Sequence, residues 1–448
     1  MPLPPKKMTY TQMIVLSFFC LILTGAILLC LPISSKTGEW TPFIDALFTS
    51  TSASCVTGLV VLDTYRHWSL FGQVVLLLLI QIGGLGVMTF IAMFSLFLRR
   101  RFSLGQRRLL MQAAGSLEIS GMARLIRRIF MGTIAAESCG ALLLSFVFCP
   151  KMGFLPGLWN AVFHSVSAFC NAGFDLMGRY SEFSSFTGKW LAFNPILNFT
   201  VMALIVTGGI GFIVWRDVTR HKAHFGEYDL HSKIAIVTTL WLLISGAVLL
   251  FIFEYNHAFK GMTLGQKILA SMFQSVTPRT AGFNTIDLTK LSEPGKLLTT
   301  MLMLIGGSPG STAGGIKTTT FAVLLLSTLA SAKRYSHVTV FKRRLDDKTI
   351  IQARSILTVY VACVFIAVLV ICSVEPYPVM DVLFEAVSAI GTVGLTLGIT
   401  PALTSISKIA LIMLMFTGRV GGLSLMLVLA ERRINIPRNR PVVQILIG

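Results

Sequence analysis

The chain has 448 residues, of which 54% are hydrophobic and 13% are charged, and its mean hydropathy is +0.76. Soluble domains carry about twice that share of charged residues, so the composition excludes an ordinary soluble protein and predicts a membrane protein with several spans. The net charge of +19 would suggest a nucleic-acid partner in a soluble protein. Here the basic residues fall in short clusters beside apolar segments, which is typical of cytoplasmic loops, and we expect no nucleic-acid partner.

The basic clusters alternate along the chain with connections that carry Asp and Glu. The positive-inside rule places the clusters in the cytoplasm and the acidic connections outside, and it predicts a multi-pass protein of the plasma (inner) membrane with both termini cytoplasmic. A basic inner face also favours contact with anionic membrane lipid. The clusters are Lys6–Lys7, Arg99–Arg101 with Arg107–Arg108, Arg124 with Arg127–Arg128, Arg216–Lys222, Lys333–Arg344 and Arg432–Arg440.

One unit of about 110 residues occurs four times, and each copy is expected to contain a spanning helix, a short helix, a glycine-ended loop and a second spanning helix. The elements are 9–31, 43–53, 54–61 and 71–98; 122–148, 158–169, 170–175 and 190–214; 232–253, 264–276, 277–284 and 296–329; and 349–374, 379–390, 391–397 and 407–429. The four pore repeats are therefore assigned to 1–105, 106–225, 226–345 and 346–448, the last with a cytoplasmic C-terminal tail.

The short helices are too short to cross a membrane, because eleven or twelve residues rise only about 17 Å. A helix that enters the bilayer and returns as extended chain must be covered by protein or line a water-filled cavity. We therefore predict four pore helices inside the bundle. The fold class is an all-α membrane protein with eight transmembrane helices around a pseudo-four-fold pore.

Each loop closes on a glycine, and these glycines are 115, 109 and 112 residues apart. Glycine permits a positive φ and a close approach of several chains, which a cage of backbone carbonyls around a cation requires. The short helices also point their partly negative C-termini at the loops, which favours a cation. A phenylalanine precedes the glycine by ten residues in three units but by nine in the third, where Pro278 stands, so the third loop is predicted to be one residue shorter. The segments are 52–58, 167–173, 276–282 and 388–394.

Thr392-Val-Gly394-Leu resembles the start of the potassium-channel filter sequence, and the four tandem units resemble the Trk/Ktr/HKT superfamily of potassium transporters. The resemblance covers essentially the whole chain and is closest to the membrane subunit of bacterial Ktr systems (KtrB-like). It implies a K⁺ filter whose backbone carbonyls coordinate the ion. Related plant proteins with serine at the first filter glycine tend to favour Na⁺, so Gly58 points to K⁺. The implied filter residues are Val56, Thr57, Gly58, Asn171, Ala172, Gly173, Thr280, Ala281, Gly282, Thr392, Val393 and Gly394.

The second spanning run of the third unit is interrupted by a segment rich in glycine and hydroxyl residues, which cannot form a stable helix interior. No phosphate-loop register fits it. The resemblance implies an intramembrane gating loop over 306–318, and a packing kink without a gating role is the alternative. The residues assigned to it are Gly306, Gly307, Ser308, Gly310, Ser311, Thr312, Gly314, Gly315 and Lys317.

Three of the second helices carry a glycine pair, at 83–84, 208–209 and 306–307, whereas the fourth has Gly418-Arg419. A guanidinium inside a span usually faces the bundle interior or water. We expect Arg419 to contact the third-unit loop and restrain the gate; the alternative is that it snorkels to the cytoplasmic interface.

Other polar residues give weaker signals. Glu137 lies inside a first helix and could pair with a basic neighbour or a backbone group, or couple transport to protons or Na⁺. Asp45, Asp381 and Glu385 are placed near the pore-helix starts, as helix caps or as cation-attracting groups of the outer mouth. The cysteines have no metal-ligand spacing, and no catalytic motif occurs, so we expect no enzyme, no catalytic residue and no cofactor in this chain.

The function predicted from these features is potassium uptake by the ion-translocating subunit of a Ktr-type system, with or without dependence on Na⁺. A Na⁺-coupled solute symporter with a broken-helix site is the alternative, although such proteins usually have two-fold inverted repeats. The resemblance further implies a homodimer and a separate cytosolic RCK-type ring (KtrA-like), and nucleotide is expected only on that partner.

Overall fold

The computed structural model describes residues 9–87, 89–90, 122–222 and 224–421, and the statements below concern these residues. Within them the regular secondary structure is helical apart from a small antiparallel hairpin, β1 (Thr339–Val340) and β2 (Arg343–Arg344). The basic clusters at 6–7, 99–108 and 432–440, and the ends of two predicted second spans at 91–98 and 422–429, lie outside the described residues.

Four long apolar helices open the four units, as predicted. Each is long and apolar enough to cross a membrane. Thr9 begins the first with a capping box to Gln12, and the second extends four residues beyond its predicted end, to Met152. The helices are α1 (Tyr10–Cys30), α7 (Met122–Met152), α12 (Leu230–Glu254) and α16 (Asp347–Val374).

The four short helices are also present. With 13 to 16 residues each, they rise about 20–24 Å, which is less than the thickness of a bilayer core. Their C-terminal halves are buried although they contain many Ser and Thr residues, so these ends lie inside the protein. The helices are α2 (Phe43–Cys55), α8 (Phe154–Phe169), α13 (Leu264–Val276) and α17 (Val379–Gly391).

The second helices are less regular than the sequence predicts. The expected continuous helix over 190–214 is wrong: α10 (Pro195–Gly209) and α11 (Phe212–His221) meet at a bend of 97°. Gly211 has a φ of 100° at this bend, and the next amide, of Phe212, donates to Gly310 O at 2.7 Å. The break is therefore stabilised by a partner from another unit.

The predicted run over 296–329 is interrupted as expected, by a loop between α14 (Glu293–Leu304) and α15 (Thr318–Ala332). The other second helices are α4 (Leu70–Leu85) and α18 (Ser405–Val420). Short helical turns complete the described chain: η1 (Pro32–Ser34), α3 (Thr64–His67), η2 (Met177–Arg179), α9 (Lys189–Ala192), η3 (Phe225–Glu227), η4 (Leu288–Lys290) and η5 (Thr400–Ala402).

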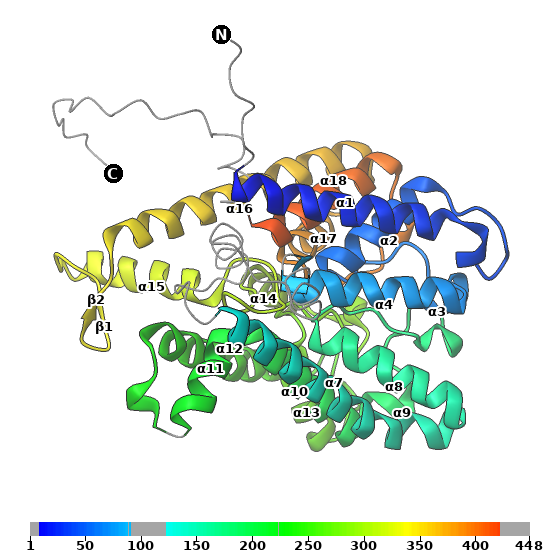
Figure 1. Cartoon of the computed structure of the whole chain (residues 1–448), viewed down its shortest axis with the longest axis horizontal. Coiled ribbons are helices and arrows are strands. Elements are labelled where there is room, and N and C mark those ends of the chain that lie inside the picture. The colour runs from blue at the N-terminus through cyan, green and yellow to red at the C-terminus, as the bar shows by residue number, and fades with distance from the viewer. Residues whose placement is uncertain (1–8, 88, 91–121, 223, 422–448) are drawn as a thin grey trace, which may run out of the picture.

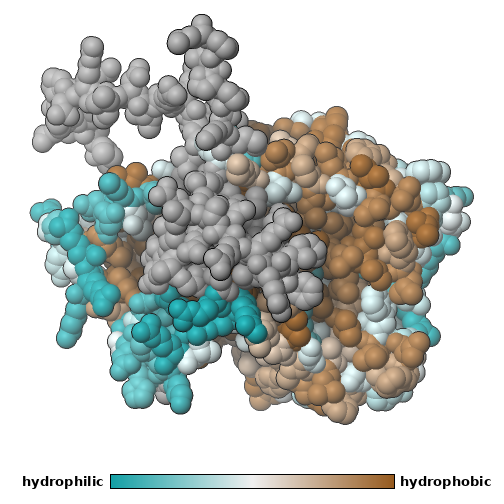
Figure 2. Space-filling view, viewed as in Figure 1, coloured by the Kyte–Doolittle hydropathy of each residue, from teal (hydrophilic) through white to brown (hydrophobic). Residues whose placement is uncertain are grey.

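The surface agrees with a membrane protein. In Figure 1, α1 and α16 run along the upper side of the molecule and α7 along the lower side, while α11 and the β-hairpin lie at the left end. Figure 2 shows apolar residues over much of the right half of the same face and hydrophilic residues over that left end. The long helices expose large apolar side chains such as Phe146, Ile244 and Phe365, each more than 60% exposed. An apolar belt of this kind is what lipid contact requires.

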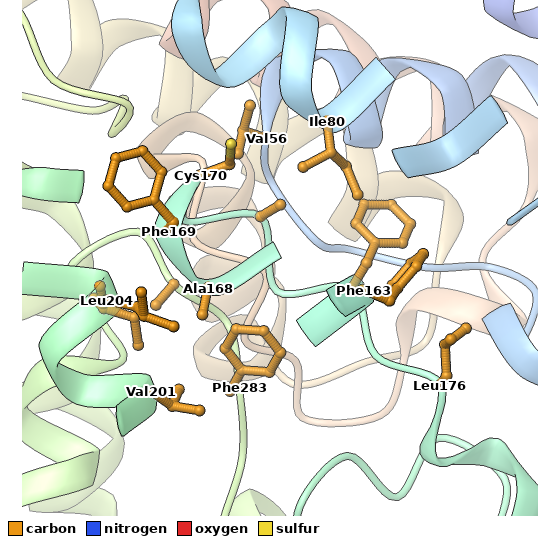
Figure 3. Close-up of a cluster of buried hydrophobic side chains, with 14 of the residues drawn as sticks. Val56, Ile80, Phe163, Ala168, Phe169, Cys170, Leu176, Val201, Leu204 and Phe283 are labelled. Atoms are coloured by element: carbon orange, nitrogen blue, oxygen red, sulfur yellow. The ribbon is translucent and has the colours of Figure 1, made fainter. Parts of the chain in front are cut away.

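The core lies where the units meet. Figure 3 shows side chains of α4, α8 and α10 packed around the end of the second pore helix, among them Ile80, Phe169 and Leu204. The pore-helix phenylalanines that precede the loop glycines are all fully buried. These are Phe48, Phe163, Phe273 and Phe384.

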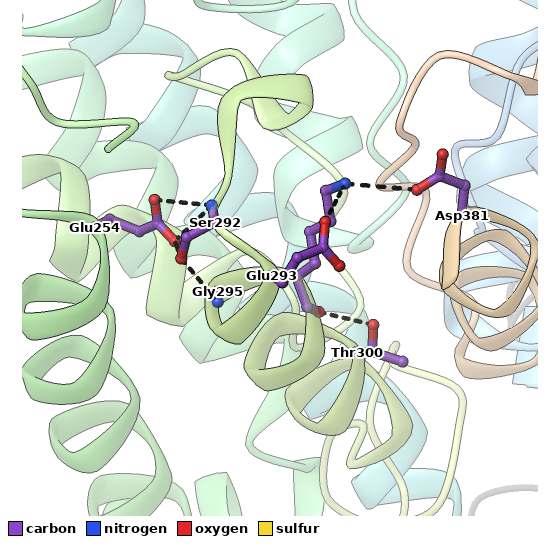
Figure 4. Close-up of polar contacts among 7 residues, drawn as sticks. Glu254, Ser292, Glu293, Gly295, Thr300 and Asp381 are labelled. Atoms are coloured by element: carbon purple, nitrogen blue, oxygen red, sulfur yellow. Dashed lines mark hydrogen bonds and ion pairs between the residues drawn. The ribbon is translucent and has the colours of Figure 1, made fainter. Parts of the chain in front are cut away.

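In both the third and the fourth unit, a carboxylate at the end of the first long helix binds the start of the second helix. Glu254, at the end of α12, accepts hydrogen bonds from the amide and hydroxyl of Ser292 at the start of α14 (Figure 4). Glu375, just after α16, accepts from the amide of Thr404 and the hydroxyl of Ser407 at the start of α18. The hydrogen bond from the Thr404 amide lowers the pKa of Glu375. The sequence shows these acids only as members of outer connections.

Candidate functional site

The four glycine-ended loops share one backbone shape. In each, the residue two positions before the closing glycine has a positive φ, between 52° and 73°, and so does the glycine, between 68° and 91°. A positive φ is rare for residues other than glycine, and four matched cases indicate a conformation imposed by the surroundings. The residues are Val56, Asn171, Thr280 and Thr392, followed by Gly58, Gly173, Gly282 and Gly394.

The loops close into a ring around one axis. A methyl group built on each closing glycine would lie within 2.7 Å of a carbonyl oxygen of the next loop, closer than the Cβ carbons of real residues approach other atoms. In every case that oxygen belongs to the residue just before the neighbour's glycine. The pairs run in cyclic order: Gly58 with Ala172, Gly173 with Ala281, Gly282 with Val393 and Gly394 with Thr57.

The third loop departs from the other three by one residue. In the first, second and fourth loops, the amide before the closing glycine donates to a carbonyl five residues earlier, as from Thr57 to Ser52 O at 2.8 Å. In the third, Ala281 donates to Thr277 O, four residues earlier, at 3.0 Å. The shorter third loop predicted from the phenylalanine spacing is therefore confirmed.

A cavity of about 100 Å³ lies against the ring and is lined by all four closing glycines. Asp63 and Asp175 line it as well, with the hydroxyl-bearing Thr396. Two acidic side chains that line one cavity can raise the local concentration of cations there. None of the outer-mouth acids named from the sequence lines this cavity.

Those acids have other roles in the described structure. Asp45, in the first turn of α2, pairs with Lys408 at 2.7 Å, and Asp381, in the first turn of α17, lies 3.6 Å from Lys296. The placement of Glu385 near a helix start is wrong. It lies in the middle of α17, is 1% exposed, and accepts hydrogen bonds from Thr396, Thr400 and the amide of Leu397, so it holds the chain that leaves the fourth loop.

The glycine-pair positions of the second helices lie directly behind the loops. A methyl group on Gly83, Gly208 or Gly418 would overlap a carbonyl oxygen at the end of the pore helix of the same unit. Glycine is required at these three positions because helix backbone packs there against helix backbone. The oxygens belong to Ser54, Phe169 and Ile390.

In the third unit, a loop replaces the part of the second helix that packs against the short helix in the other three units. This segment leaves α14 at Ile305 and returns at Ile316, and its ends are joined by hydrogen bonds from Gly306 N to Ile316 O and from Thr318 N to Gly307 O. The ammonium of Lys317 donates to Ala313 O at 2.6 Å within the loop. The segment is thus a closed excursion between two helices rather than a flexible connection.

The excursion touches the second and fourth units. Thr312 donates through its hydroxyl to Phe169 O at 3.1 Å and through its amide to Gly208 O at 3.2 Å. A methyl group on Gly314 would meet the side chain of Thr392 in the fourth loop. The excursion therefore lies against the ends of two pore helices, just behind the ring.

Arg419 joins the same loop to the first unit. Its guanidinium donates to the carbonyl oxygens of Thr312, Gly83 and Gly84, the last at 2.8 Å. The guanidinium therefore points to the loop, as expected, and not to the cytoplasmic interface. Its part in gating stays a prediction.

Glu137 has neither of the partners expected for it. Its carboxylate accepts a hydrogen bond from Gln81 Nε2 at 3.3 Å, and its backbone oxygen accepts from Ser165 in α8 at 2.6 Å. The side chain thus joins α7 to α4 behind the second loop.

Comparison with known proteins identifies the family. The family model described as TrkH, cation transport protein, matches residues 3–439. The chain belongs to the TrkH cation transport family. It is a multi-pass membrane protein of a transporter family and not an enzyme.

Curated relatives of this family member span nearly its whole length. It is 42% identical to the potassium/sodium uptake protein NtpJ of Enterococcus hirae, over 93% of this chain and 92% of the relative. It is 40% identical to the Ktr system potassium uptake protein B of Bacillus subtilis, over 93% and 92%. The crystal structure of the potassium transporter TrkH from Vibrio parahaemolyticus has the same fold, with a TM-score of 0.73 at 17% identity over 95% of this chain and 86% of that one.

Sequence reasoning missed one functional candidate in the loops, Arg279. It stands three residues before Gly282, where the other units have Cys55, Cys170 and Gly391. The sequence does contain a signal for it, because the other three units have a small, uncharged residue at this position.

Proposed function

We propose that this protein takes up K⁺ across the plasma membrane as the ion-translocating subunit of a Ktr-type system. The observation that carries the proposal is the closed ring of four loops, in which each closing glycine faces a carbonyl oxygen of the next loop. Backbone carbonyls arranged around an axis can replace the water that surrounds a cation. The relatives named for potassium uptake support K⁺ as the ion.

In this proposal the ion enters from the outer cavity, where Asp63 and Asp175 attract it, and loses water to the carbonyls of the four loops. The filter residues are those at positions 56–58, 171–173, 280–282 and 392–394. The C-terminal ends of the four pore helices add partial negative charge behind the ring. An inside-negative membrane potential contributes about 2.3 kcal/mol per 100 mV for each cation that crosses.

The gate in this proposal is the excursion over 306–317 together with Arg419. Thr312 accepts from Arg419 and donates to Phe169, so the loop is held on both sides of the passage. A cation could pass only after this part of the loop moved. The positive charge of Arg419 beside the passage also repels the ion when the loop is in place.

The wider architecture belongs to the same proposal. Eight spans surround a pseudo-four-fold pore, two copies form a dimer, and a cytosolic nucleotide-binding ring of the RCK type (KtrA-like) docks on the basic inner face. The relatives named as Ktr system proteins support a system of several components.

The proposal is tested by Rb⁺ and K⁺ uptake in cells that lack their own K⁺ uptake systems, with and without Na⁺ and with and without a co-expressed RCK subunit. We expect uptake that saturates with K⁺, needs no organic solute and increases with the subunit. Uptake that required an organic solute would instead support a symporter.

The filter assignment has a test of its own. Gly58→Ser places an oxygen-bearing side chain where even a methyl group would overlap Ala172 O, and we expect it to reduce the preference for K⁺ over Na⁺. An unchanged preference in a variant that still transports would contradict the assignment.

A further inference from the structure

A buried arginine lies in the third loop, directly before the left-handed residue Thr280. Arg279 is only 7% exposed, and among the described residues no carboxylate lies within ion-pair distance of it. A charge that is buried without a counter-charge inside a membrane protein is costly. Charged residues inside membrane proteins are therefore rare, and those that occur usually have a function.

The guanidinium of Arg279 bridges two backbone carbonyls from different elements. Nη1 donates to Thr239 O on α12 at 3.3 Å, and Nη2 donates to Gly306 O at 3.1 Å. Gly306 is the first glycine of the gating loop. Hydrogen bonds from a charged donor to a carbonyl are stronger than neutral ones, and the planar guanidinium fixes the direction of both.

Gly306 is the point where both ends of the gating loop meet. Its amide donates to Ile316 O at 2.8 Å, and a methyl group on it would overlap Gly314 O. A side chain that holds Gly306 therefore holds the entry and the exit of the loop together.

The third unit needs this bridge because it lacks the packing of the other units. Gly83, Gly208 and Gly418 each pack on the last turn of their own pore helix, whereas Gly306 packs on Gly314 of its own loop. Backbone contact between second helix and pore helix is thus replaced in the third unit by the side chain of Arg279.

A small cavity adjoins the bridge. Gly209, Thr239 and Gly307 line it together with Arg279. Arg279 therefore lies beside the first turn of the gating loop, and its hydrogen bond to Gly306 adds to the close packing of Gly306 on Gly314.

We propose that Arg279 is a positioning residue that ties the third filter loop to the first glycine of the gating loop, so that filter and gate move as one unit. The inference rests on the proposed filter and gate. Only one peptide bond separates Arg279 from Thr280, the first filter residue of its loop. A shift of Gly306 is thereby transmitted to the filter backbone through one side chain, that of Arg279.

The test combines a structural and a functional measurement on the full chain. Ser311→Cys, in the middle of the gating loop, is labelled with a membrane-impermeant thiol reagent in inside-out vesicles, and the labelling of the parent chain is subtracted. Rb⁺ uptake and its inhibition by Na⁺ are measured on the same variants without Ser311→Cys. The variants are Arg279→Gln and Arg279→Lys, and the control is Arg66→Gln, because Arg66 also donates to a backbone carbonyl, Gly178 O at 2.9 Å, on the outer side.

We expect Arg279→Gln to raise the labelling rate of Ser311→Cys about tenfold, as the loss of a hydrogen bond from a charged donor predicts, and to weaken the Rb⁺ preference over Na⁺ in parallel. Arg279→Lys keeps the charge but replaces the planar two-armed donor with one ammonium nitrogen on a shorter side chain, and it should give intermediate labelling and intermediate Rb⁺ preference. If Arg279→Gln does not reach the membrane, the lysine variant carries the test. Arg66→Gln should label and transport like the parent.

Unchanged labelling in both Arg279 variants would overturn the proposal, and so would faster labelling with an unchanged Rb⁺ preference. A failure of the proposed function is a separate result: a parent chain without Rb⁺ uptake would remove the filter and the gate. Labelling of Ser311→Cys needs no transport and would still report whether Arg279 holds the loop.

Discussion

The ring of loops makes a quantitative prediction for Gly173→Ala. The new methyl group would lie 2.7 Å from Ala281 O and 3.0 Å from Gly282 Cα. An ordinary contact needs about 3.4 Å, so the third loop must retreat by about 0.7 Å. Both of these neighbours are backbone atoms of a filter loop, so no flexible side chain can absorb the shift.

Two effects add in this variant, and a control separates them. Alanine at a φ of +68° costs about 1–2 kcal/mol of folding free energy wherever it occurs. Gly261→Ala has the same kind of strain, at a φ of +83°, but meets nothing within 4 Å. A difference between the two variants therefore measures the collision in the ring.

The expected result follows from how sensitive a preorganised site is to displacement. A misplacement of about 1 Å can reduce the efficiency of such a site about 100-fold, so a shift of about 0.7 Å should lower Rb⁺ uptake at least tenfold. The preference for Rb⁺ over Na⁺ should fall as well, because displacement of one loop changes the distances between the ion and the surrounding carbonyl oxygens. Gly261→Ala should lower the midpoint of thermal unfolding by a few degrees and leave uptake unchanged.

The assay is Rb⁺ uptake in cells deficient in K⁺ transport, with Na⁺ as competitor and with the amount of membrane protein measured by immunoblot. Normal uptake and normal ion preference in Gly173→Ala, at parental protein levels, would refute the close approach of the second and third loops.

Three further predictions follow from contacts described above. Arg419→Ala removes the hydrogen bonds that hold the gating loop and should raise Rb⁺ flux or make it independent of the regulatory subunit; flux and regulation like those of the parent would contradict the gate. Lys408→Ala leaves the poorly exposed carboxylate of Asp45 unpaired and should destabilise the protein by about 1–3 kcal/mol, measured as thermal unfolding in detergent, with partial recovery in the double variant with Asp45→Asn. The pKa of Glu375 is lowered by the Thr404 amide, so its stabilisation is present above the unfolded pKa of about 4.3 and is lost as pH falls through the lower folded value. Glu375→Gln should therefore be less stable at pH 7 and lose less stability between pH 6 and pH 3; parallel unfolding curves over that range would contradict a stabilising role of the hydrogen bonds from Thr404 and Ser407 to Glu375.

Much of the fold could be predicted because it depends on local pattern. The length of an apolar run decides whether a helix can span the membrane. The sequence identifies the short helices because a helix of 13 residues is too short to cross the bilayer. The sequence shows the register of the loops because Gly58, Gly173 and Gly394 each follow a buried phenylalanine by ten residues. The one-residue deletion in the third loop could be read from that spacing alone.

The errors concern features that depend on partners. The bend at Gly211 interrupts an apolar run, and it forms because the Phe212 amide finds Gly310 O in another unit. No local pattern shows that contact. Glu385 was assigned by its distance from a helix start, whereas its actual partners, Thr396 and Thr400, follow the fourth loop.

The departures from four-fold symmetry in the third unit are connected physically. The second helix of the third unit ends at Ile305, so Gly306 packs on Gly314 of its own loop and not on a pore helix. The carbonyl oxygen of Gly306 is instead bound by a side chain. Arg279 supplies that side chain from the shortened loop, and Arg419 holds the other side of the same excursion at Thr312. Both arginines bind backbone carbonyls rather than carboxylates, so neither positive charge is paired with an acid among the described residues. In the proposed gate, a loop held by two such charges blocks the ion sterically and electrostatically, and movement of the loop relieves both barriers together.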